Sequence, residues 1–463
     1  MLMSDRDLSA VCLLKPELMA SLERGGMMKP QEILSRIAGA ASTRSTRDLE
    51  IYLHIPFCSS KCLFCDWVVE VPTKELLSGP AKRAKYVNRL CQQISFYGPH
   101  LTQLGYRPKY IYWGGGTPTR LDPGETARIV ETLHESFDLS GVSQHTLEST
   151  PNDMTPEKAE NLKRCGVDRV SVGVQSFNAF QLRTSGRSHS AEDATRSIGI
   201  LRAAGINNIN IDLISGFPGE KREWFADTLQ KTIDLNPTHI TVYSYRATPL
   251  TRMAMQIEQG VKEPLTVEEM VSAYEYAQNM LQKADYNEYL YNCFARKPED
   301  QFDAGLYGYG LQGETIGFGS GASSIIGHHY LLNEKENFNS YMEQPCNFDI
   351  VIPYDYSAVR VLADVAGNAL MTREGLYFDR FKNITGCDFE RVMEISGVRG
   401  WLRYLANCGA VFRWEKDRVL MDERLIHRVY ITHLYYSNNP HIRQEQATTA
   451  PVASATMAGV AGN

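Results

Sequence analysis

The stretch LEIYLHIPFCSSKCLFCDW, residues 49–67, joins a strand-like run to a loop that holds three cysteines. Its first seven residues are rich in branched apolar and aromatic side chains, which is typical of a β-strand. Cys58, Cys62 and Cys65 then follow with the spacing C-x3-C-x2-C. Thiolates this close on one loop can converge on one metal cluster, whereas the chain's seven other cysteines are scattered singly.

The number of clustered cysteines limits the kind of metal site. Structural zinc sites usually take four ligands in paired C-x2-C spacings, and this chain has no second pair. A cubane iron–sulfur cluster also normally takes four thiolates. Three thiolates leave one iron without a protein ligand, and such an open iron can bind a substrate or cofactor.

Strand-like runs alternate with helix-like segments after residue 48. The runs are rich in β-branched and aromatic residues and cover 109–115, 145–150, 169–175, 208–214 and 239–245. The segments between them have helical periodicity, with Gly or Pro at their ends. This pattern predicts an α/β fold of at least six β/α units, a partial or full (β/α) barrel of parallel strands.

Composition and punctuation suggest how the 463 residues are organised. The formal net charge of −6 gives no overall basic field for nucleic acid or an anionic membrane. No run is apolar enough for a signal peptide or a membrane span, so we expect a cytoplasmic protein. The expected parts are an N-terminal arm of short helices (1–48), a barrel core (49–260), a barrel completion with a substrate segment (261–352), a small C-terminal helical, winged-helix-like module (353–438) and a disordered tail (439–463).

The cysteine spacing, with Phe64 before the third cysteine, resembles the signature of the radical S-adenosylmethionine (SAM) superfamily. Members of that family bind SAM through the open iron of a 4Fe–4S cluster, and reductive cleavage gives a 5′-deoxyadenosyl radical. The longer string YLHIPFCSSKCLFCDW is similar to the family of oxygen-independent coproporphyrinogen oxidases, haem chaperones and related methyltransferases. The resemblance implies that Cys58, Cys62 and Cys65 ligate the cluster.

Further motifs match that family in order along the chain. The run YWGGGTPT, residues 112–119, resembles the motif that holds the methionine amino group of SAM. The resemblance implies cofactor contacts from Tyr52, Gly114, Gly115, Gly116, Thr117, Glu148, Gln175, Arg187 and Asp212. Most of these residues fall at or just after predicted strand ends, where a barrel places its site.

Two features distinguish the branches of this family. The decarboxylases follow the third cysteine with x-Cys, whereas this chain has Asp66 and Trp67. The haem chaperones carry a His-Asn pair ahead of a Gly-rich segment, whereas the comparable residues 292–324 contain no histidine. We therefore expect the methyltransferase or cyclopropanase branch, which transfers a one-carbon unit to an sp² carbon of an aromatic or heteroaromatic natural product. Coproporphyrinogen oxidation and haem chaperoning are the alternatives.

One-carbon transfer implies further ligands and partners. That branch is thought to use two SAM molecules, and residues 317–327 resemble the segment that contacts the second, through Phe318, Ser323 and Ile325. An acid or base must finish the transfer, and the candidates are Tyr243, Tyr245, Glu314 and the pair His328 and His329. The expected partners are the small-molecule substrate, an electron donor such as flavodoxin or ferredoxin, and a companion methyltransferase. Trp67, Trp113 and Tyr112 are candidates for the wall of a flat-substrate pocket.

Overall fold

The computed structural model describes residues 24–41, 47–66, 79–248, 251–327, 329–333, 338–351, 366–367, 369–370, 372–394, 402 and 405–431. The first 23 residues of the expected arm, Trp67 and the expected tail at 439–463 lie outside this part of the chain. No helix among the described residues is long and apolar enough to cross a membrane.

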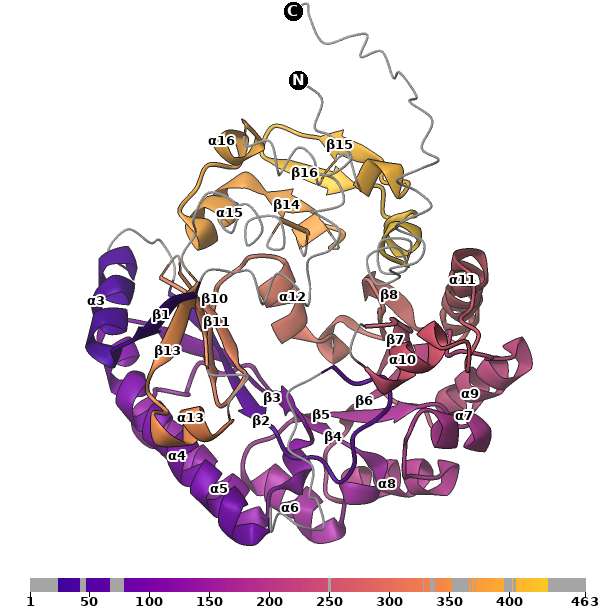
Figure 1. Cartoon of the computed structure of the whole chain (residues 1–463), viewed down its shortest axis with the longest axis horizontal. Helices are drawn as coiled ribbons and strands as arrows, with labels where there is room; N and C mark the ends of the chain where they lie inside the picture. Colours follow the sequence, from indigo (N-terminus) through magenta and orange to yellow (C-terminus); the bar gives the residue numbers. More distant parts are fainter. Residues whose placement is uncertain are drawn as a thin grey trace, which may run out of the picture.

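A curved sheet of thirteen described strands forms the centre of the molecule (Figure 1). Its order is β1-β13-β12-β11-β10-β2-β3-β4-β5-β6-β7-β9-β8. Seven neighbouring strands run parallel, which confirms the predicted α/β fold. They are β10 (Glu314–Phe318), β2 (Asp48–Ile55), β3 (Arg107–Gly115), β4 (Gln144–Ser149), β5 (Arg169–Gln175), β6 (Asn208–Ser215) and β7 (His239–Ser244).

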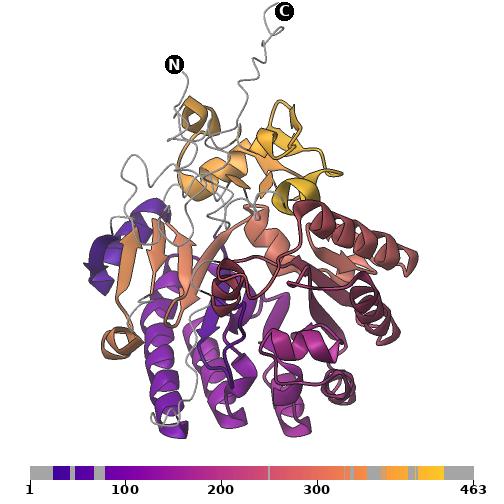
Figure 2. The ribbon, with the colours of Figure 1, turned by 45° about the vertical axis from the view of Figure 1, so that its right-hand side comes forward.

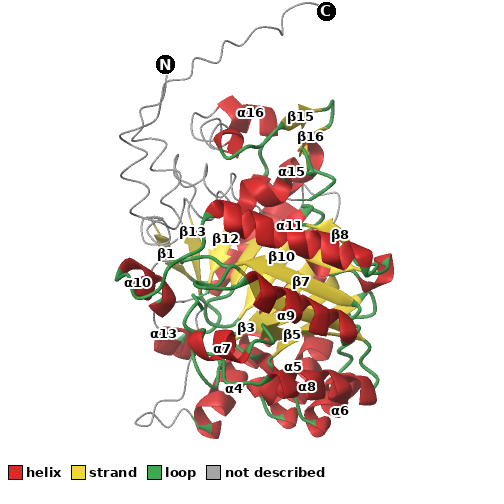
Figure 3. Ribbon diagram, turned by 90° about the vertical axis from the view of Figure 1, so that its right-hand side faces the viewer, coloured by secondary structure: helices red, strands yellow, loops and turns green. Residues whose placement is uncertain are grey.

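Long helices cover the outer face of the parallel strands (Figure 1). They are α4 (Pro80–Gln103), α5 (Pro123–Ser136), α6 (Pro156–Arg164), α8 (Ala191–Ala203), α9 (Arg222–Asp234) and α11 (Val267–Lys283). Helices α9 and α11 pack together beside β7 (Figure 3). Helix α11 begins at Val267 because the side chain of Thr266 accepts a hydrogen bond from the Glu269 N–H and caps it. Two short helices, α7 (Ala179–Thr184) and α10 (Arg252–Glu258), follow β5 and β7.

Antiparallel strands extend the sheet on both sides. Beyond β10 lie β11 (Ser323–Ile326), β12 (His329–Leu332), β13 (Phe348–Val351) and β1 (Arg24–Met28); beyond β7 lie β9 (Cys293–Ala295) and β8 (Asn287–Leu290). Three more helices are α3 (Pro30–Ala41), α12 (Asp303–Tyr309) and α13 (Phe338–Glu343). In the N-terminal arm, where short helices and a linker were expected, residues 24–28 form strand β1, which pairs with β13 at the edge of the sheet.

A small C-terminal module lies beyond one end of the α/β body (Figure 2). It contains β14 (Leu376–Tyr377), α15 (Phe378–Thr385), α16 (Phe389–Glu394), β15 (Phe412–Trp414) and β16 (Arg418–Met421). The strands form a separate sheet in the order β14-β16-β15. The module has its own apolar cluster, which includes Leu376, Phe381 and Val419, and Ile325 of β11 packs against it.

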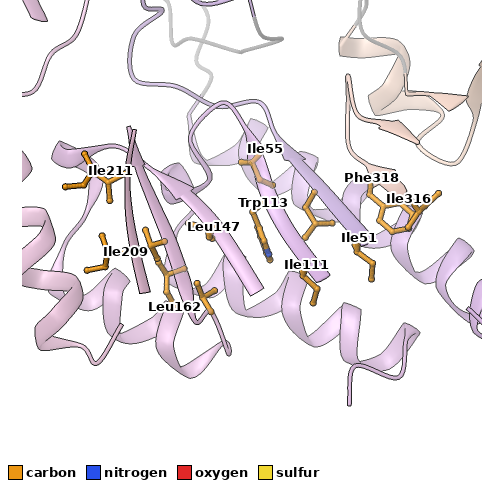
Figure 4. Packing of buried hydrophobic residues seen from close by; sticks show 14 of the residues in the cluster. Ile51, Ile55, Ile111, Trp113, Leu147, Leu162, Ile209, Ile211, Ile316 and Phe318 are labelled. Carbon is orange, nitrogen blue, oxygen red and sulfur yellow. The ribbon is translucent and has the colours of Figure 1, made fainter. Parts of the chain in front are cut away.

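The parallel strands bury branched apolar residues against the helices (Figure 4). Six of them and one aromatic residue, Trp113, are at most 2% exposed; the six are Ile51, Ile55, Ile111, Leu147, Ile209 and Ile211. Trp113, a candidate for the pocket wall, belongs to this core because its side of β3 faces the helices. Its Nε1 donates a hydrogen bond to Nε2 of His145 at 2.7 Å, so the buried indole is satisfied.

Phe318 ends β10 in the same core (Figure 4). Replacing Phe318 with Ala should lower the free energy of unfolding by about 3–5 kcal/mol, because a fully buried ring would leave a cavity. Urea denaturation followed by circular dichroism measures this loss. Phe180→Ala is the matched control, since that ring is 51% exposed and its loss should cost less than about 1 kcal/mol. Equal losses for the two variants would contradict a core position for Phe318.

Candidate active site

The inner face of the parallel strands carries polar or aromatic side chains at alternate positions, and we call it the lumen face. It comprises Glu50, Tyr52 and His54 on β2, Tyr110 and Tyr112 on β3, Thr146 and Glu148 on β4, Arg169, Ser171 and Gln175 on β5, Asn210 and Asp212 on β6, and His239, Thr241 and Tyr243 on β7. Hydrogen bonds across strands, such as Asn210 Nδ2 to Ser171 Oγ at 2.7 Å, place these residues on one side of the sheet. A closed barrel usually fills its interior with branched apolar side chains, so this polar face is available for a ligand.

One end of the lumen face is covered and the other meets solvent. At the covered end, the Phe302 ring beside α12 lies 4.8 Å from the Arg169 guanidinium and 5.3 Å from the Tyr112 ring. Tyr307 of α12 lies 5.0 Å from the Tyr110 ring. Near the carboxyl end of β7, Tyr243 is 46% exposed. A ligand therefore meets the lumen face at the carboxyl ends of the strands.

The cysteine loop, residues 56–66, leaves the carboxyl end of β2. The Leu63 N–H donates to the Ser185 carbonyl at 2.9 Å, and the Met253 N–H donates to the Leu63 carbonyl at 2.9 Å. The Phe64 ring packs 5.5 Å from the Phe217 ring. These contacts hold the loop between the segments that follow β5 and β7. Burial raises the pKa of the Cys58 thiol, so cation or metal binding is needed to hold it as a thiolate.

The glycine turn after β3 packs against the start of the cysteine loop. Gly115 has a φ of +99°, and a Cβ there would lie 2.5 Å from the His54 ring. A Cβ on Gly116 would lie 2.7 Å from the Ile55 carbonyl oxygen. Thr117 Oγ1 lies 3.6 Å from Cys58 Sγ. The Gly116 and Thr117 N–H groups donate to the Ile55 and Phe57 carbonyls at 2.9 and 2.8 Å, so the turn requires glycine in order to pack this closely against the loop.

Glu148 joins this turn to the lumen face. The Tyr112 hydroxyl donates to Glu148 Oε1 at 2.5 Å, and the Tyr52 ring stacks on Tyr112 with centroids 6.1 Å apart. Burial raises the pKa of Glu148 to about 7, although the hydrogen bond from Tyr112 lowers it. Near neutral pH both the protonated and the ionised forms of the carboxyl are populated. A cationic ligand would favour the ionised form, and an anionic ligand would favour the protonated form.

Gln175 and Arg187 present polar atoms without partners at the end of β5. Gln175 has a φ of +67°, uncommon outside glycine, and its Oε1 is buried with no hydrogen-bond partner among the described residues. Arg187 Nη1 donates to Cys62 Sγ at 3.4 Å and Nη2 donates to the Gly173 carbonyl, while Nε has no partner in the described part of the chain. Strained backbone and unsatisfied buried polar atoms concentrate at functional sites.

Asp212 lies deeper on the lumen face, in a polar network. Its carboxylate accepts hydrogen bonds from Ser171 Oγ and Asn210 Nδ2, each at 2.7 Å. Burial raises the pKa of Asp212, and these bonds and the Arg169 charge oppose the rise. Sequence reasoning missed Ser171, Asn210 and Arg169. The signal was available, because polar residues occupy alternate positions in RVSVGVQ and NINIDLI.

These residues fit the 4Fe–4S cluster and SAM that the resemblance implies. Three thiols lie on one partly exposed loop, Thr117 lies beside Cys58, and Arg187 Nε, which has no partner among the described residues, suits a carboxylate. No three His, Cys, Asp or Glu side chains of the described residues converge as they would around one metal ion. Cluster thiolates bind different irons, so this spread does not conflict with cluster binding.

The five acid–base candidates lie in different places. His329 is on β12, where it pairs with Ile326 of β11. Tyr243 is on the lumen face, near Tyr112. The pKa of the Tyr112 hydroxyl is raised first by burial, then by the negative charge of Glu148 and then by Tyr243. Tyr245 is 6% exposed in an apolar cluster beneath the cysteine loop. Glu314 pairs with Leu49 at the amino ends of β10 and β2, and its Oε1 accepts from the Gly327 N–H at 2.5 Å. The expectation for Glu314 is wrong, because it stabilises a turn at the opposite end of the strands. His328 lies outside the described residues.

The side chains expected to contact a second SAM do not share one surface. Phe318 lies in the core with its ring 6.5 Å from Tyr97 and 6.4 Å from Phe137. Ile325 packs against the apolar cluster of the C-terminal module. For Phe318 the expected ligand contact is wrong, because its ring packs in the core on the helix side of β10. Ile325 pairs with Thr315, whose hydroxyl donates to Glu50 Oε2 at 2.9 Å, so Ile325 lies on the same side of the sheet as Glu50 and its ligand contact stays a prediction. Ser323, on β11, is partly exposed.

Glu148→Gln should stabilise the ligand-free protein increasingly as the pH rises. The unfolded carboxyl has the ordinary pKa of 4.5, whereas the folded one has a pKa of about 7. The folded state therefore favours the proton, and ionisation costs stability that reaches its full value above about pH 7. Relative to wild type, the free energy of unfolding of Glu148→Gln should rise by on the order of 2–3 kcal/mol between about pH 5 and about pH 8. Thermal melts at both pH values measure the gain, with exposed Glu131→Gln as the control. A pH-independent difference would contradict a raised pKa for Glu148.

Comparison with known proteins bears on this arrangement. Residues 52–232 match the model of the radical SAM superfamily. The heme chaperone HemW of Lactococcus lactis is 28% identical over 351 residues, which are 74% of this chain and 86% of that protein. The oxygen-independent coproporphyrinogen III oxidase of Escherichia coli is 30% identical over 314 residues, which are 64% of this chain and 65% of that protein. The chain thus spans just under two thirds of that oxidase.

These relatives correct the expected reaction. The expectation of one-carbon transfer to a natural product is wrong, because the relatives at 28% and 30% identity are a heme chaperone and a coproporphyrinogen oxidase. A companion methyltransferase was expected only for that transfer, whereas the second SAM stays a prediction. Asp66, Trp67 and the missing histidine do not separate this chain from those two groups.

A solved structure supports the same placement at the level of fold. The coproporphyrinogen III oxidase HemN from Escherichia coli, a radical SAM enzyme, superposes with a TM-score of 0.68 at 24% identity, over 89% of this chain and 94% of that one. The matched residues 52–232 contain the cysteine loop, the glycine turn and the polar ends of β4, β5 and β6. Residues 52–232 thus match the radical SAM superfamily, whose cofactors are a 4Fe–4S cluster and SAM, and the chain is similar to coproporphyrinogen oxidases and heme chaperones.

Proposed function

We propose that this protein is a radical SAM enzyme that oxidatively decarboxylates a porphyrinogen, as its oxygen-independent coproporphyrinogen III oxidase relatives do. The observation that supports this most is the polar lumen face beside the cysteine loop, open to solvent near Tyr243 and covered beside α12. A substrate on that face would lie next to the site of radical formation and away from bulk water.

The proposed reaction has a definite balance. Loss of a propionate carboxyl as carbon dioxide, with formation of a vinyl group, removes one hydrogen atom and one electron from the substrate. Bound cluster and SAM supply the 5′-deoxyadenosyl radical that takes the hydrogen atom, and a separate acceptor takes the electron.

The residues of this chain would bind and orient the reactants. Arg187 would hold a ligand carboxylate through its free Nε, and Gln175 would accept a hydrogen bond through Oε1. Glu148 would accept hydrogen bonds from ligand hydroxyl or ammonium groups beside the glycine turn. Tyr52, Tyr112 and Tyr243 would present aromatic surface to a tetrapyrrole, because broad rings bury area against a flat ligand.

Heme binding without turnover is the second candidate. It is favoured by the match to the Lactococcus lactis chaperone, which covers 86% of that protein. Both candidates handle tetrapyrroles, so they differ in chemistry rather than in ligand class.

One anaerobic experiment separates the two candidates. The reconstituted protein is incubated with SAM and a low-potential reductant, together with either coproporphyrinogen III or heme. Production of 5′-deoxyadenosine with carbon dioxide and vinyl porphyrinogen would support the oxidase. Stable heme retention through gel filtration, with no carbon dioxide, would overturn that proposal in favour of the chaperone.

Cys62→Ser should abolish 5′-deoxyadenosine formation, because a cluster left with two thiolates is poorly held. The absorbance of the reconstituted cluster and its iron content should fall with the activity. Cys165→Ser is the matched control, since that partly exposed cysteine lies at the end of α6, outside the cysteine loop. It should keep full iron content, and loss of iron in both variants would contradict the assignment of the cluster to the cysteine loop.

A further inference from the structure

An ion pair joins the end of the cysteine loop to the segment after β7. Arg246 Nη2 lies 2.6 Å from Asp66 Oδ2, although the two residues are 180 positions apart in the sequence. Asp66 directly follows Cys65, and Arg246 lies two residues beyond the end of β7. Arg246 Nε also donates to Thr248 Oγ1 at 2.9 Å. This second bond fixes the orientation of the guanidinium that faces Asp66.

Other contacts hold the earlier parts of the same loop. Cys58 lies beside Thr117, and Cys62 accepts a hydrogen bond from Arg187. Leu63 makes two backbone hydrogen bonds, to Ser185 and Met253. All of these contacts involve residues that precede Cys65 in the sequence, whereas the Arg246–Asp66 pair involves the residue directly after Cys65.

We propose that the Arg246–Asp66 ion pair positions Cys65 for cluster binding. Arg246 is then a positioning residue: it touches neither the cluster nor SAM and acts through Asp66. Without the pair, Asp66 would be free to move, and the Cys65 thiol would reach its iron in fewer of the conformations that the loop samples.

The exposure of the pair separates this role from general stability. The Arg246 and Asp66 side chains are 24% and 32% exposed. Pairs this accessible to water contribute only about 0–1 kcal/mol to folding. Losing the pair should therefore leave the fold intact and affect mainly the local geometry of the loop.

The test measures how fast the reconstituted protein releases iron to a chelator under anaerobic conditions. Asp66→Asn and Arg246→Met should each release iron roughly fivefold faster than wild type, while the melting temperature of the cluster-free protein changes little. The electron paramagnetic resonance spectrum of the reduced cluster should also respond less to added SAM. The charge-swapped double variant Asp66→Arg with Arg246→Asp should recover much of the lost retention.

A matched pair elsewhere on the protein serves as the control. Lys231 and Asp227 form an ion pair on α9 at 2.8 Å, and Lys231→Met should release iron at the wild-type rate. Wild-type release by both Asp66→Asn and Arg246→Met would overturn the proposal. Faster release with an equally large loss of cluster-free stability would overturn it too, since the pair would then be a folding contact. Neither outcome depends on the identity of the substrate.

Discussion

Every parallel strand of the sheet faces two environments at once, a dry layer of helices and a polar lumen face. Val170 and Val172 of β5 are fully buried toward the helices, and Ser171 between them binds Asp212 on the other side. Because side chains alternate with a period of two, a shift by one residue would exchange the two faces. Burial of the apolar residues against the helices therefore fixes which residues lie on the lumen face. The polar site depends on this apolar packing.

The lumen face is costly to the folded state. Burial raises the pKa values of Glu50 and Glu148 to about 7, which means that their ionised forms are disfavoured in the folded protein. Arg169, 2% exposed, offsets part of this cost through its charge on Glu148 and Asp212. Buried atoms on Gln175 and Arg187 that have no partner in the described part of the chain add to it. Such groups persist where a ligand supplies the missing partners, so the strain concentrates at the end of the sheet where the cofactor residues gather.

Local sequence patterns predicted most of the parallel strands. They could not predict strand pairings or side-chain contacts between residues far apart in the sequence. The strands around 109–115 and 208–214 were predicted because a strand buried against helices needs β-branched residues. Strand β10 was missed as a parallel strand because its partner β2 lies some 260 residues earlier and its sequence, ETIGF, lies in a Gly-rich segment. Asp66 was taken as evidence for a branch of the family, although its contact is with Arg246, which no local spacing reveals. The reaction could not be predicted either, because the cofactor motifs are shared by relatives with different chemistries.

Glu148 also links ligand binding to the solvent. Its carboxyl carries a proton in a large fraction of molecules near pH 7, where its pKa lies. A cationic ligand such as a sulfonium or ammonium group, arriving beside the glycine turn, stabilises the ionised form and expels that proton. Binding of a cationic ligand at this site would therefore be a proton exchange as well as an association, and its apparent affinity would strengthen as the pH rises to the pKa of Glu148.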